Sequence, residues 1–477
     1  MPHSPQRSSQ HPSQPPTYSA AVAPGALPLL GHGHRLLRGS AGYLSSLHQH
    51  GDLVAMRLGP TTVQVPCHPE LLNQVLADHR LFDKGGAFYD RARDVAGNGL
   101  VTCPYRDHQH QRRLVQSAFR RPQLARYAQV MQAEIEFATG GWQPGKVIDA
   151  FPTFHGIALR TLGRTLCATA IDAELARSVE RAFDTVLNGV FRQMLLPTPV
   201  RELPLPGNLR YRRALTQLHD ATRQLIATYR APLPQPDLTA PDPTGTGTGT
   251  GTGTEPDLLA SLLAARGEDG ARLSDAEVHD QVITLLAAGT ETVAATLTWA
   301  LWRLSQHPAA AEQVRAELAE VLPDGRAPGW TDLPRLGAVD RVVSETLRLH
   351  PPGWLFTRVT TAPTELAGRT LRAGTTLVFS PAAVSRHPAA YRAPAQFDPD
   401  RWRPERVTPA ARRAFLPFGS GARKCVGDLF ARTECVLVLA TLLSRRRLVP
   451  EPDADLRPVP LATVLRPRRL HLRVAAH

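Results

Sequence analysis

The hydrophobic positions along the chain are spaced mostly as in helices, and two stretches instead have the pattern of β-hairpins. Residues 52–65 turn at Gly59-Pro60, and residues 364–379 turn near Gly368 and Ala373-Gly374, with β-branched residues in both stretches. Almost every other segment has helical periodicity. The pattern predicts a mainly α-helical protein with small β-sheets.

One predicted helix, from Ser274 to about Gln306, is unusually long. Ser274 and Glu277 can form a capping box at its start, and Pro308 ends it. Roughly 30 residues at ~1.5 Å each give a rod of ~45 Å, which is long enough to cross a whole domain. Because the helix is apolar around much of its circumference at residues 282–286, we expect it to run through the core.

Two segments have compositions that do not build a core. Residues 1–22 are rich in Pro, Ser, Gln and His and are predicted to form a disordered leader. Residues 232–256 contain a Thr-Gly repeat, which offers few side chains for packing. The strongest motifs lie on both sides of this repeat and require one another, so we predict a flexible loop within a single catalytic domain, residues 23–477.

The chain of 477 residues carries a net charge of +13, which would suit an anionic partner such as nucleic acid. Only three lysines contribute, Lys84, Lys146 and Lys424, and the arginines are spread without a dense basic block. We therefore interpret the charge mainly as a general preference for arginine and expect no nucleic-acid partner.

The five cysteines include no C-x-x-C pair, so the sequence predicts neither a disulfide framework nor a zinc site. Reduced cysteines are typical of the cytoplasm. No stretch approaches the ~20 apolar residues of a membrane span. These observations predict a cytoplasmic protein with no membrane partner, and we expect a monomer.

Residues 418–427, Phe-Gly-Ser-Gly-Ala-Arg-Lys-Cys-Val-Gly, contain three glycines and precede a predicted helix at residues 428–443. Cys425 therefore lies at a helix N-terminus, where unpaired N–H groups and the helix dipole favour a thiolate. A thiolate ligand is what heme iron requires to split the O–O bond of dioxygen. The alternative is a buried free cysteine in a glycine-rich turn.

The spacing Phe418-x-x-Gly421-x-Arg423-x-Cys425-x-Gly427 resembles the heme-binding signature of the cytochrome P-450 family, with every expected position filled. The resemblance implies the cytochrome P-450 fold, in which a long central helix crosses a buried heme b. It also implies that Cys425 is the axial ligand of the iron, that Phe418 packs beside the sulfur, that Arg423 meets a heme propionate, and that Gly427 belongs to the cofactor site.

Glu345-x-x-Arg348 places two opposite charges on one face of a predicted helix that ends at Pro351-Pro352. Such pairs are common and by themselves indicate little. Downstream, residues 397–402 resemble the family segment whose arginine, here Arg401, completes a Glu-Arg-Arg network behind the heme loop. We expect these three residues to hold the Cys425 loop in place.

The long helix contains Ala288-Gly289-Thr290-Glu291-Thr292 near its middle. A glycine inside a helix costs up to ~1 kcal/mol relative to alanine, so Ala288 and Gly289 are predicted to let a ligand approach, here the heme. Thr292 can bond back to a backbone carbonyl and open a groove for water or dioxygen. The alternative is a polar notch in a core helix.

The same segment resembles the oxygen-activation motif of the family. The resemblance implies that Thr292 and Glu291 are catalytic, with Glu291 on the proton-delivery route. An acid–alcohol pair of this kind favours dioxygen and two electrons over peroxide as the source of oxygen.

A buried heme needs cations for its two carboxylates. At the family positions stand His108 and Arg112, spaced by four residues, and Arg358. The resemblance assigns all three to cofactor binding.

The resemblance covers nearly the whole chain, from residues 24–32 onward. Residues 50–54, 82–86 and 416–419 look similar to bacterial terpene-oxidising members of the pentalenene oxygenase type. The resemblance places Leu285 and Trp354-Leu355-Phe356 in an apolar substrate pocket. We therefore predict a terpenoid substrate, with a polyketide or a steroid-like molecule as the alternative.

No dinucleotide fingerprint G-x-G-x-x-G follows a predicted strand, so electrons from NAD(P)H must arrive through partners, which we expect to be ferredoxin reductase and ferredoxin. An acidic ferredoxin would suit the basic residues Arg113, Arg120, Arg121 and Lys424. Two other interpretations stay open: a heme-thiolate sensor or binding protein without turnover, and a basic nucleic-acid-binding protein with coincidental motifs.

Overall fold

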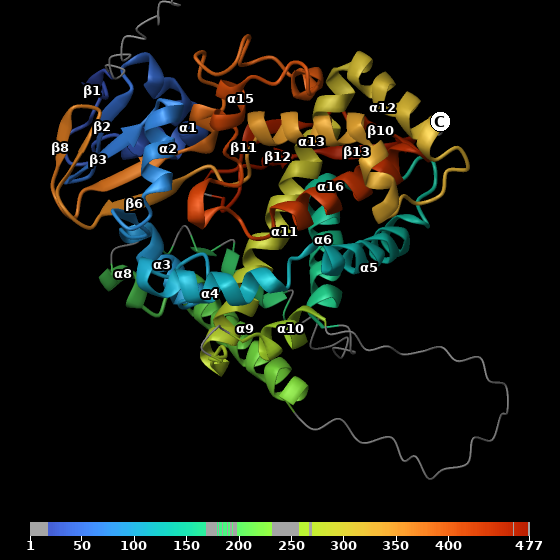
Figure 1. Ribbon diagram of the computed structural model, residues 1–477, viewed down its shortest axis with the longest axis horizontal. Coiled ribbons are helices and arrows are strands. Elements are labelled where there is room, and N and C mark those ends of the chain that lie inside the picture. The colour runs from blue at the N-terminus through green and yellow to red at the C-terminus, as the bar shows by residue number, and fades with distance from the viewer. Residues whose placement is uncertain are drawn as a thin grey trace, which may run out of the picture.

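The longest element of the fold is helix α11, Asp275–Gln306, which crosses the helical part of the molecule (Figure 1). The Ser274 hydroxyl accepts the Glu277 N–H at 3.3 Å, and the Glu277 carboxylate accepts the Ser274 N–H at 2.8 Å. This is the predicted capping box, and the next helix starts at Pro308 as the sequence predicts. Most of α11 is buried, so the predicted core helix is confirmed.

The computed structural model describes residues 18–167, short stretches between 179 and 193, and residues 198–230, 257–266, 270–460 and 462–475. The other α-helices are α1 Gly33–Ser46, α2 Pro69–Ala77, α3 Ala87–Ala96, α4 Tyr105–Ser117, α5 Arg121–Thr139, α6 Ala150–Leu166, α8 Thr198–Glu202, α9 Pro206–Arg230, α10 Leu258–Ala264, α12 Pro308–Val321, α13 Gly337–Leu349, α14 Pro381–Val384, α15 Pro409–Ala414 and α16 Asp428–Leu443. Short 3-10 helices are η1 Leu47–Gln49, η2 Trp330–Arg335, η3 Pro399–Trp402 and η4 Gly421–Arg423.

The strands form one larger sheet and three small ones. The larger sheet has six strands in the order β1-β2-β3-β9-β6-β4 and lies beside the helical part (Figure 1). A three-stranded sheet has the order β10-β13-β5, and β11-β12 and β7-β8 are two-stranded. The strands are β1 Ala20–Val22, β2 Leu53–Leu58, β3 Thr61–Pro66, β4 Phe82–Asp83, β5 Val147–Asp149, β6 Phe356–Thr360, β7 Thr364–Leu366, β8 Arg369–Leu371, β9 Thr376–Phe379, β10 Arg447–Pro450, β11 Asp455–Pro458, β12 Pro467–Arg469 and β13 His471–Ala475.

Both predicted hairpins are present, with one difference. Strands β2 and β3 pair antiparallel around Gly59-Pro60, and β7 and β8 pair around Ala367-Gly368, whose two φ angles are positive. The second turn, near Gly374, does not fold β9 back onto β8. Strand β9 instead pairs with β6 and β3 in the larger sheet.

The predicted boundary of the leader at residue 22 is wrong. Residues 20–22 form β1, which pairs in parallel with Leu53–Ala55 and so belongs to the larger sheet. Three residues with extended backbone can join a sheet edge even when the sequence before them has no core-forming pattern. Residues 1–17 and the Thr-Gly segment at 232–256 lie outside the described residues.

One hydrophobic cluster gathers residues from both sides of the Thr-Gly segment, including Leu218 before it and Leu258 after it. Helix α11 packs against α6, α13, α16 and α9 at the centre of this cluster. By length and composition α11 could cross a membrane, but 72% of its most apolar window is buried inside the fold. It is therefore a core helix.

A buried carboxyl group, Glu434 of α16, lies in this core. Its side chain is fully buried and faces Thr161 of α6, yet neither carboxyl oxygen accepts a hydrogen bond of normal geometry within the described residues. Burial raises the pKa of Glu434 to about 8 from the usual 4.5. The folded protein therefore keeps this group neutral at pH 7.

We expect Glu434→Gln to stabilise the protein increasingly as the pH rises. Below pH 4.5 Glu434 is protonated in both states, but between 4.5 and about 8 only the unfolded state ionises, which favours unfolding. The unfolding free energy of Glu434→Gln should exceed that of the natural protein by an amount that approaches roughly 4 kcal/mol at about pH 8. Thermal unfolding midpoints of both proteins at about pH 5.5 and pH 8 measure it, and parallel pH dependences would contradict it.

Candidate functional site

The loop that carries Cys425 is bent tightly against α2. Gly421 has a φ of +67°, and a Cβ there would lie 2.6 Å from the carbonyl oxygen of Leu76, so this position requires glycine. The Cys425 N–H donates to the Phe418 carbonyl at 2.9 Å, which closes the loop. Helix α16 starts three residues after Cys425, within the predicted range.

The Cys425 side chain is exposed, although protein surrounds it. Burial raises the pKa of its thiol, and the Gly427 N–H, Arg112 and Lys424 act in the opposite direction. Ala288 is likewise exposed, although most of helix α11 is buried, and α11 packs against α16. An accessible thiol and an accessible small side chain thus come from parts of the chain that are neighbours in the fold.

Thr292 bonds back along α11 as predicted, because its hydroxyl donates to the Ala288 carbonyl at 2.7 Å. Glu291 is buried, and the Thr463 hydroxyl donates to its Oε2. Gly289 differs from the prediction. A Cβ at Gly289 would lie 2.8 Å from the side chain of Leu162 in α6, so its small size serves the contact between two helices.

Four predicted cofactor residues, three arginines and a histidine, come together with a lysine that was not predicted. Arg423 donates to Asp83 at 2.8 Å and to the Cys103 carbonyl at 2.8 Å, and its buried Nε has no partner within the described residues. Arg358 is buried and donates to the Thr357 carbonyl at 2.7 Å. Arg112 donates to the Lys424 carbonyl, next to Cys425.

The electrostatics of this group show an excess of positive charge. Burial and the charges of Arg423 and Arg358 hold the pKa of Lys84, the missed residue, well below its usual value. Burial, Arg423, Lys84 and Arg112 lower the pKa of His108 to about 3, so its imidazole is neutral. We name these five residues, Lys84, His108, Arg112, Arg358 and Arg423, the cationic cluster.

The residues present fit heme. The cluster supplies positive charge and one unpartnered buried donor for two carboxylates, and Cys425 supplies an accessible thiol. Lys84 directly follows β4 in the sequence. Its position beside the other four residues could not be predicted, because the five residues lie on four segments that are far apart in the sequence.

Glu345, Arg348 and Arg401 form the expected network, with both members of the main pair fully buried. Arg348 donates to Glu345 at 2.7 and 2.8 Å, and the Arg401 Nε lies 3.5 Å from the same carboxylate. The Trp402 indole N–H and the Asp398 N–H add bonds of 2.9 and 3.0 Å. The sequence analysis did not identify the role of Trp402.

The predicted pocket residues do not share one apolar cluster. Leu285 lies in the main core, whereas Trp354 and Leu355 pack with α1 and the larger sheet. Phe356 stacks on Phe379 with ring centroids 5.6 Å apart. Trp354 is buried, and its indole N–H donates to the Ala462 carbonyl at 3.0 Å, so this ring contributes to core packing.

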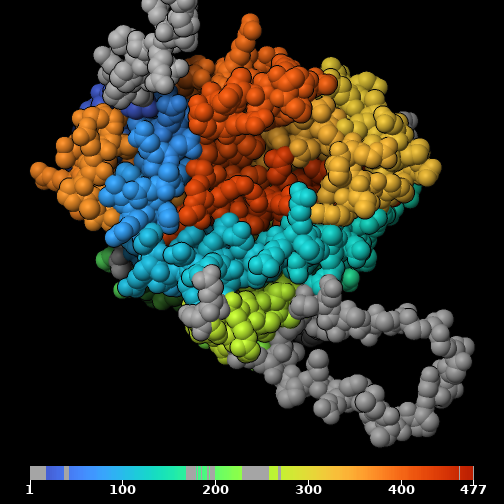
Figure 2. All heavy atoms as spheres, viewed as in Figure 1, coloured from blue at the N-terminus to red at the C-terminus, as the bar shows by residue number. Residues whose placement is uncertain are grey.

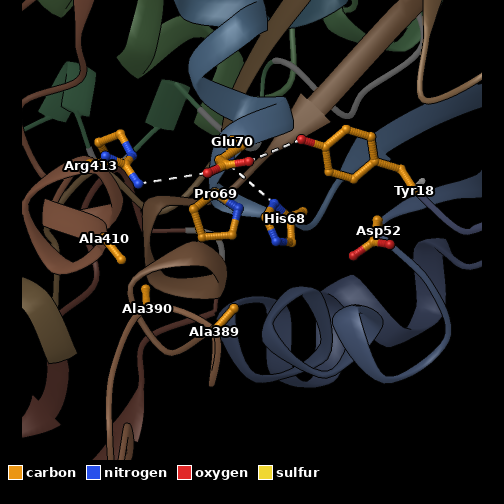
Figure 3. A pocket seen from close by; sticks show the side chains of 9 residues that line it. All are labelled: Tyr18, Asp52, His68, Pro69, Glu70, Ala389, Ala390, Ala410 and Arg413. Atoms are coloured by element: carbon orange, nitrogen blue, oxygen red, sulfur yellow. Dashed lines mark hydrogen bonds and ion pairs between the residues drawn. The ribbon is translucent and has the colours of Figure 1, made fainter. Parts of the chain in front are cut away.

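A separate polar pocket of about 300 Å³ lies beside the larger sheet (Figure 3). Glu70 accepts a 3.1 Å bond from Tyr18 and lies 3.7 Å from Arg413, and its N–H donates to His68. Asp52 bonds Ser19. These groups satisfy one another and fasten the N-terminal part of the described chain to α2 and α15.

The accessible Cys425 thiol near buried cationic side chains is the arrangement that a heme-thiolate protein requires. A family model described as Cytochrome P450 matches residues 22–474, and the chain belongs to this family. Pentalenene oxygenase of Streptomyces avermitilis is 56% identical over 96% of this chain and 98% of its own length. Cyclooctatin synthase of Streptomyces melanosporofaciens is 42% identical over 92% of each chain.

A third relative, cyclooctat-9-en-7-ol 5-monooxygenase of Streptomyces melanosporofaciens, is 41% identical over 95% of each chain. The crystal structure of the cytochrome P450DA heme domain superposes with a TM-score of 0.81 at 24% identity, covering 97% of this chain and 99% of that one. The fold, the monooxygenase class and the heme-thiolate cofactor predicted from the sequence are confirmed. Because the family match covers nearly the whole chain, the motifs are not coincidental, as the interpretation of a basic nucleic-acid-binding protein required.

We expect Glu345→Gln to destabilise the protein by about 3 kcal/mol or more, because it leaves the Arg348 charge buried without its counter-ion. Glu312 and Arg315 offer a matched control, since they have the same spacing on α12 but are exposed. Glu312→Gln should cost less than about 1 kcal/mol. Urea unfolding of both variants measures the difference, and equal losses would contradict the structural role.

Proposed function

We propose that this cytochrome P450 inserts one oxygen atom from dioxygen into an apolar terpenoid at an unactivated carbon. The observation that carries the proposal is the 56% identity to pentalenene oxygenase over nearly the whole chain, with a second and third terpene-oxidising relative above 40%. A polyketide or a steroid-like molecule is the alternative substrate.

The cofactor roles follow from the geometry above. Heme held by a cysteine thiolate splits the O–O bond of dioxygen and supplies the oxidant. We propose that Cys425 would hold the heme through its thiolate and that Phe418 and Gly427, both half-buried in the same loop, would pack near the sulfur. The cationic cluster would bind the two propionates, whose negative charge would offset the repulsion that Arg423 and Arg358 exert on Lys84.

The proposed roles of α11 rest on one hydroxyl group and one acid. Thr292 donates its hydroxyl to the Ala288 carbonyl at the exposed part of the helix, where its oxygen can still accept a hydrogen bond. Glu291, one residue away and buried, would take up a proton and give it to the proton-delivery route. The Glu345 network would keep the Cys425 loop in position.

We propose ferredoxin, reduced by NAD(P)H through ferredoxin reductase, as the electron donor. Arg113, Arg120, Arg121 and Lys424 are all exposed. Arg113 lies on α4, which borders the C-terminal segment on the face shown in Figure 2. A positive surface on the Cys425 side attracts an acidic partner and speeds its docking. The protein would act as a monomer in the cytoplasm.

We expect Cys425→Ala to abolish the red-shifted Soret band of the reduced carbon-monoxide complex, because alanine provides no thiolate. Cys435→Ala is the control, since Cys435 is buried in α16 and should leave the band unchanged. Absorbance spectra of the purified proteins measure both. A band that survives in Cys425→Ala would show that another group binds the iron.

We expect a substrate panel to separate the proposed classes. The protein is incubated with NADPH, ferredoxin reductase, ferredoxin and either pentalenene and other terpene hydrocarbons, a steroid or a macrolactone. Terpenes should produce a low-to-high-spin shift and hydroxylated products by mass spectrometry, and omission of ferredoxin should abolish the products. Turnover of the steroid or macrolactone alone would overturn the terpenoid assignment.

A further inference from the structure

The loop between β11 and β12, residues 459–466, is tied to two other parts of the fold. The indole N–H of Trp299 in α11 donates to the Leu465 carbonyl at 2.9 Å, and the Leu465 N–H donates to the Pro352 carbonyl at 2.9 Å. Trp354 holds the Ala462 carbonyl, as described above. We name residues 462–466 the hairpin tip.

The hairpin tip also reaches the acid of α11. The Thr463 hydroxyl donates to Glu291 Oε2, across 172 positions of sequence. Arg466, from the same tip, is a charged neighbour of Glu291. Burial lowers the pKa of the Arg466 guanidinium, and the charge of Glu291 acts in the opposite direction. The Arg466 guanidinium lies 4.4 Å from the centre of the Phe151 ring and is also influenced by Asp149.

The contact with Thr463 fixes the direction of the Glu291 carboxylate. The nearby Arg466 charge acts over a distance and defines no orientation. A hydroxyl bonded to one carboxylate oxygen does define one, because hydrogen bonds weaken steeply away from linear geometry. An acid that relays protons needs such a fixed orientation.

We propose that Thr463 is a positioning residue for proton delivery, which acts by holding Glu291 through Oε2. The inference rests on the proposed role of Glu291. It follows that proton delivery depends on the hairpin tip, which is the part of the chain that also supports Trp354 and the segment before β6. A substrate that shifts the tip would change the yield of product per electron pair as well as its own binding.

The experiment compares Thr463→Val, Thr463→Ser and Glu291→Gln with pentalenene as the probe in the full ferredoxin system. Thr298→Val is the control, because Thr298 is a buried threonine of α11 whose hydroxyl bonds only along the helix to Ala294 at 2.7 Å in the described contacts. Product formed per NADPH consumed and the solvent deuterium isotope effect on turnover are measured. The carbon-monoxide spectrum and the dissociation constant of the probe report folding and binding.

We expect Thr463→Val to lower the product yield per NADPH about three- to tenfold and to raise the isotope effect, with spectrum and probe binding unchanged. Thr463→Ser and Thr298→Val should behave as the natural protein. If Thr463→Val does not fold, Thr463→Ala repeats the comparison with Thr463→Ser.

Three outcomes would overturn the proposal, and they differ in meaning. If the product yield per NADPH falls in Glu291→Gln but not in Thr463→Val, the proposed role of Thr463 is wrong and that of Glu291 stands. No loss in Glu291→Gln removes the role of Glu291 and the inference with it. Equal losses in the valine and serine variants show that Thr463 acts by packing.

Discussion

The buried ion pair between Glu345 and Arg348 is the interaction on which the packing of residues 385–402 around α13 depends. Burying two charges costs several kcal/mol for each ion, and the cost is offset only if every donor and acceptor finds a partner. Arg348 meets that condition by donating also to the carbonyls of Ser385, Pro394 and Gln396. One side chain thereby fixes three points on the irregular segment after α14. A more apolar packing could be equally stable, but it would not impose this single arrangement.

The sequence predicts features that depend on neighbours along the chain. The capping box of α11, the turn at Gly59-Pro60 and the back-bond of Thr292 were all predictable because their partners lie within a few residues. Glu345-x-x-Arg348 shows the limit of such reasoning, because the same spacing recurs exposed on α12. Only the packing of residues 385–402 around α13 makes one pair buried and the other not.

Contacts between distant segments could not be predicted in the same way. The cationic cluster joins positions 84, 108, 112, 358 and 423, and the family resemblance supplied four of them but not Lys84. Gly289 and Trp354 also make packing contacts, with α6 and near α1, that their positions in the sequence did not predict. The net charge of +13 likewise does not show where the charges lie. Part of the positive charge lies in the cationic cluster, where a cofactor with two carboxylates fits.

The tethers of the hairpin tip attach to its backbone. Trp299 and Trp354 bind the carbonyls of Leu465 and Ala462, and Pro352 accepts a backbone N–H, so none of these three bonds depends on which side chain the tip carries. Substitution of the side chains of the tip would therefore leave these three bonds in place. Thr463 is the exception, because its own side chain makes the contact with Glu291 and that contact requires a hydroxyl group.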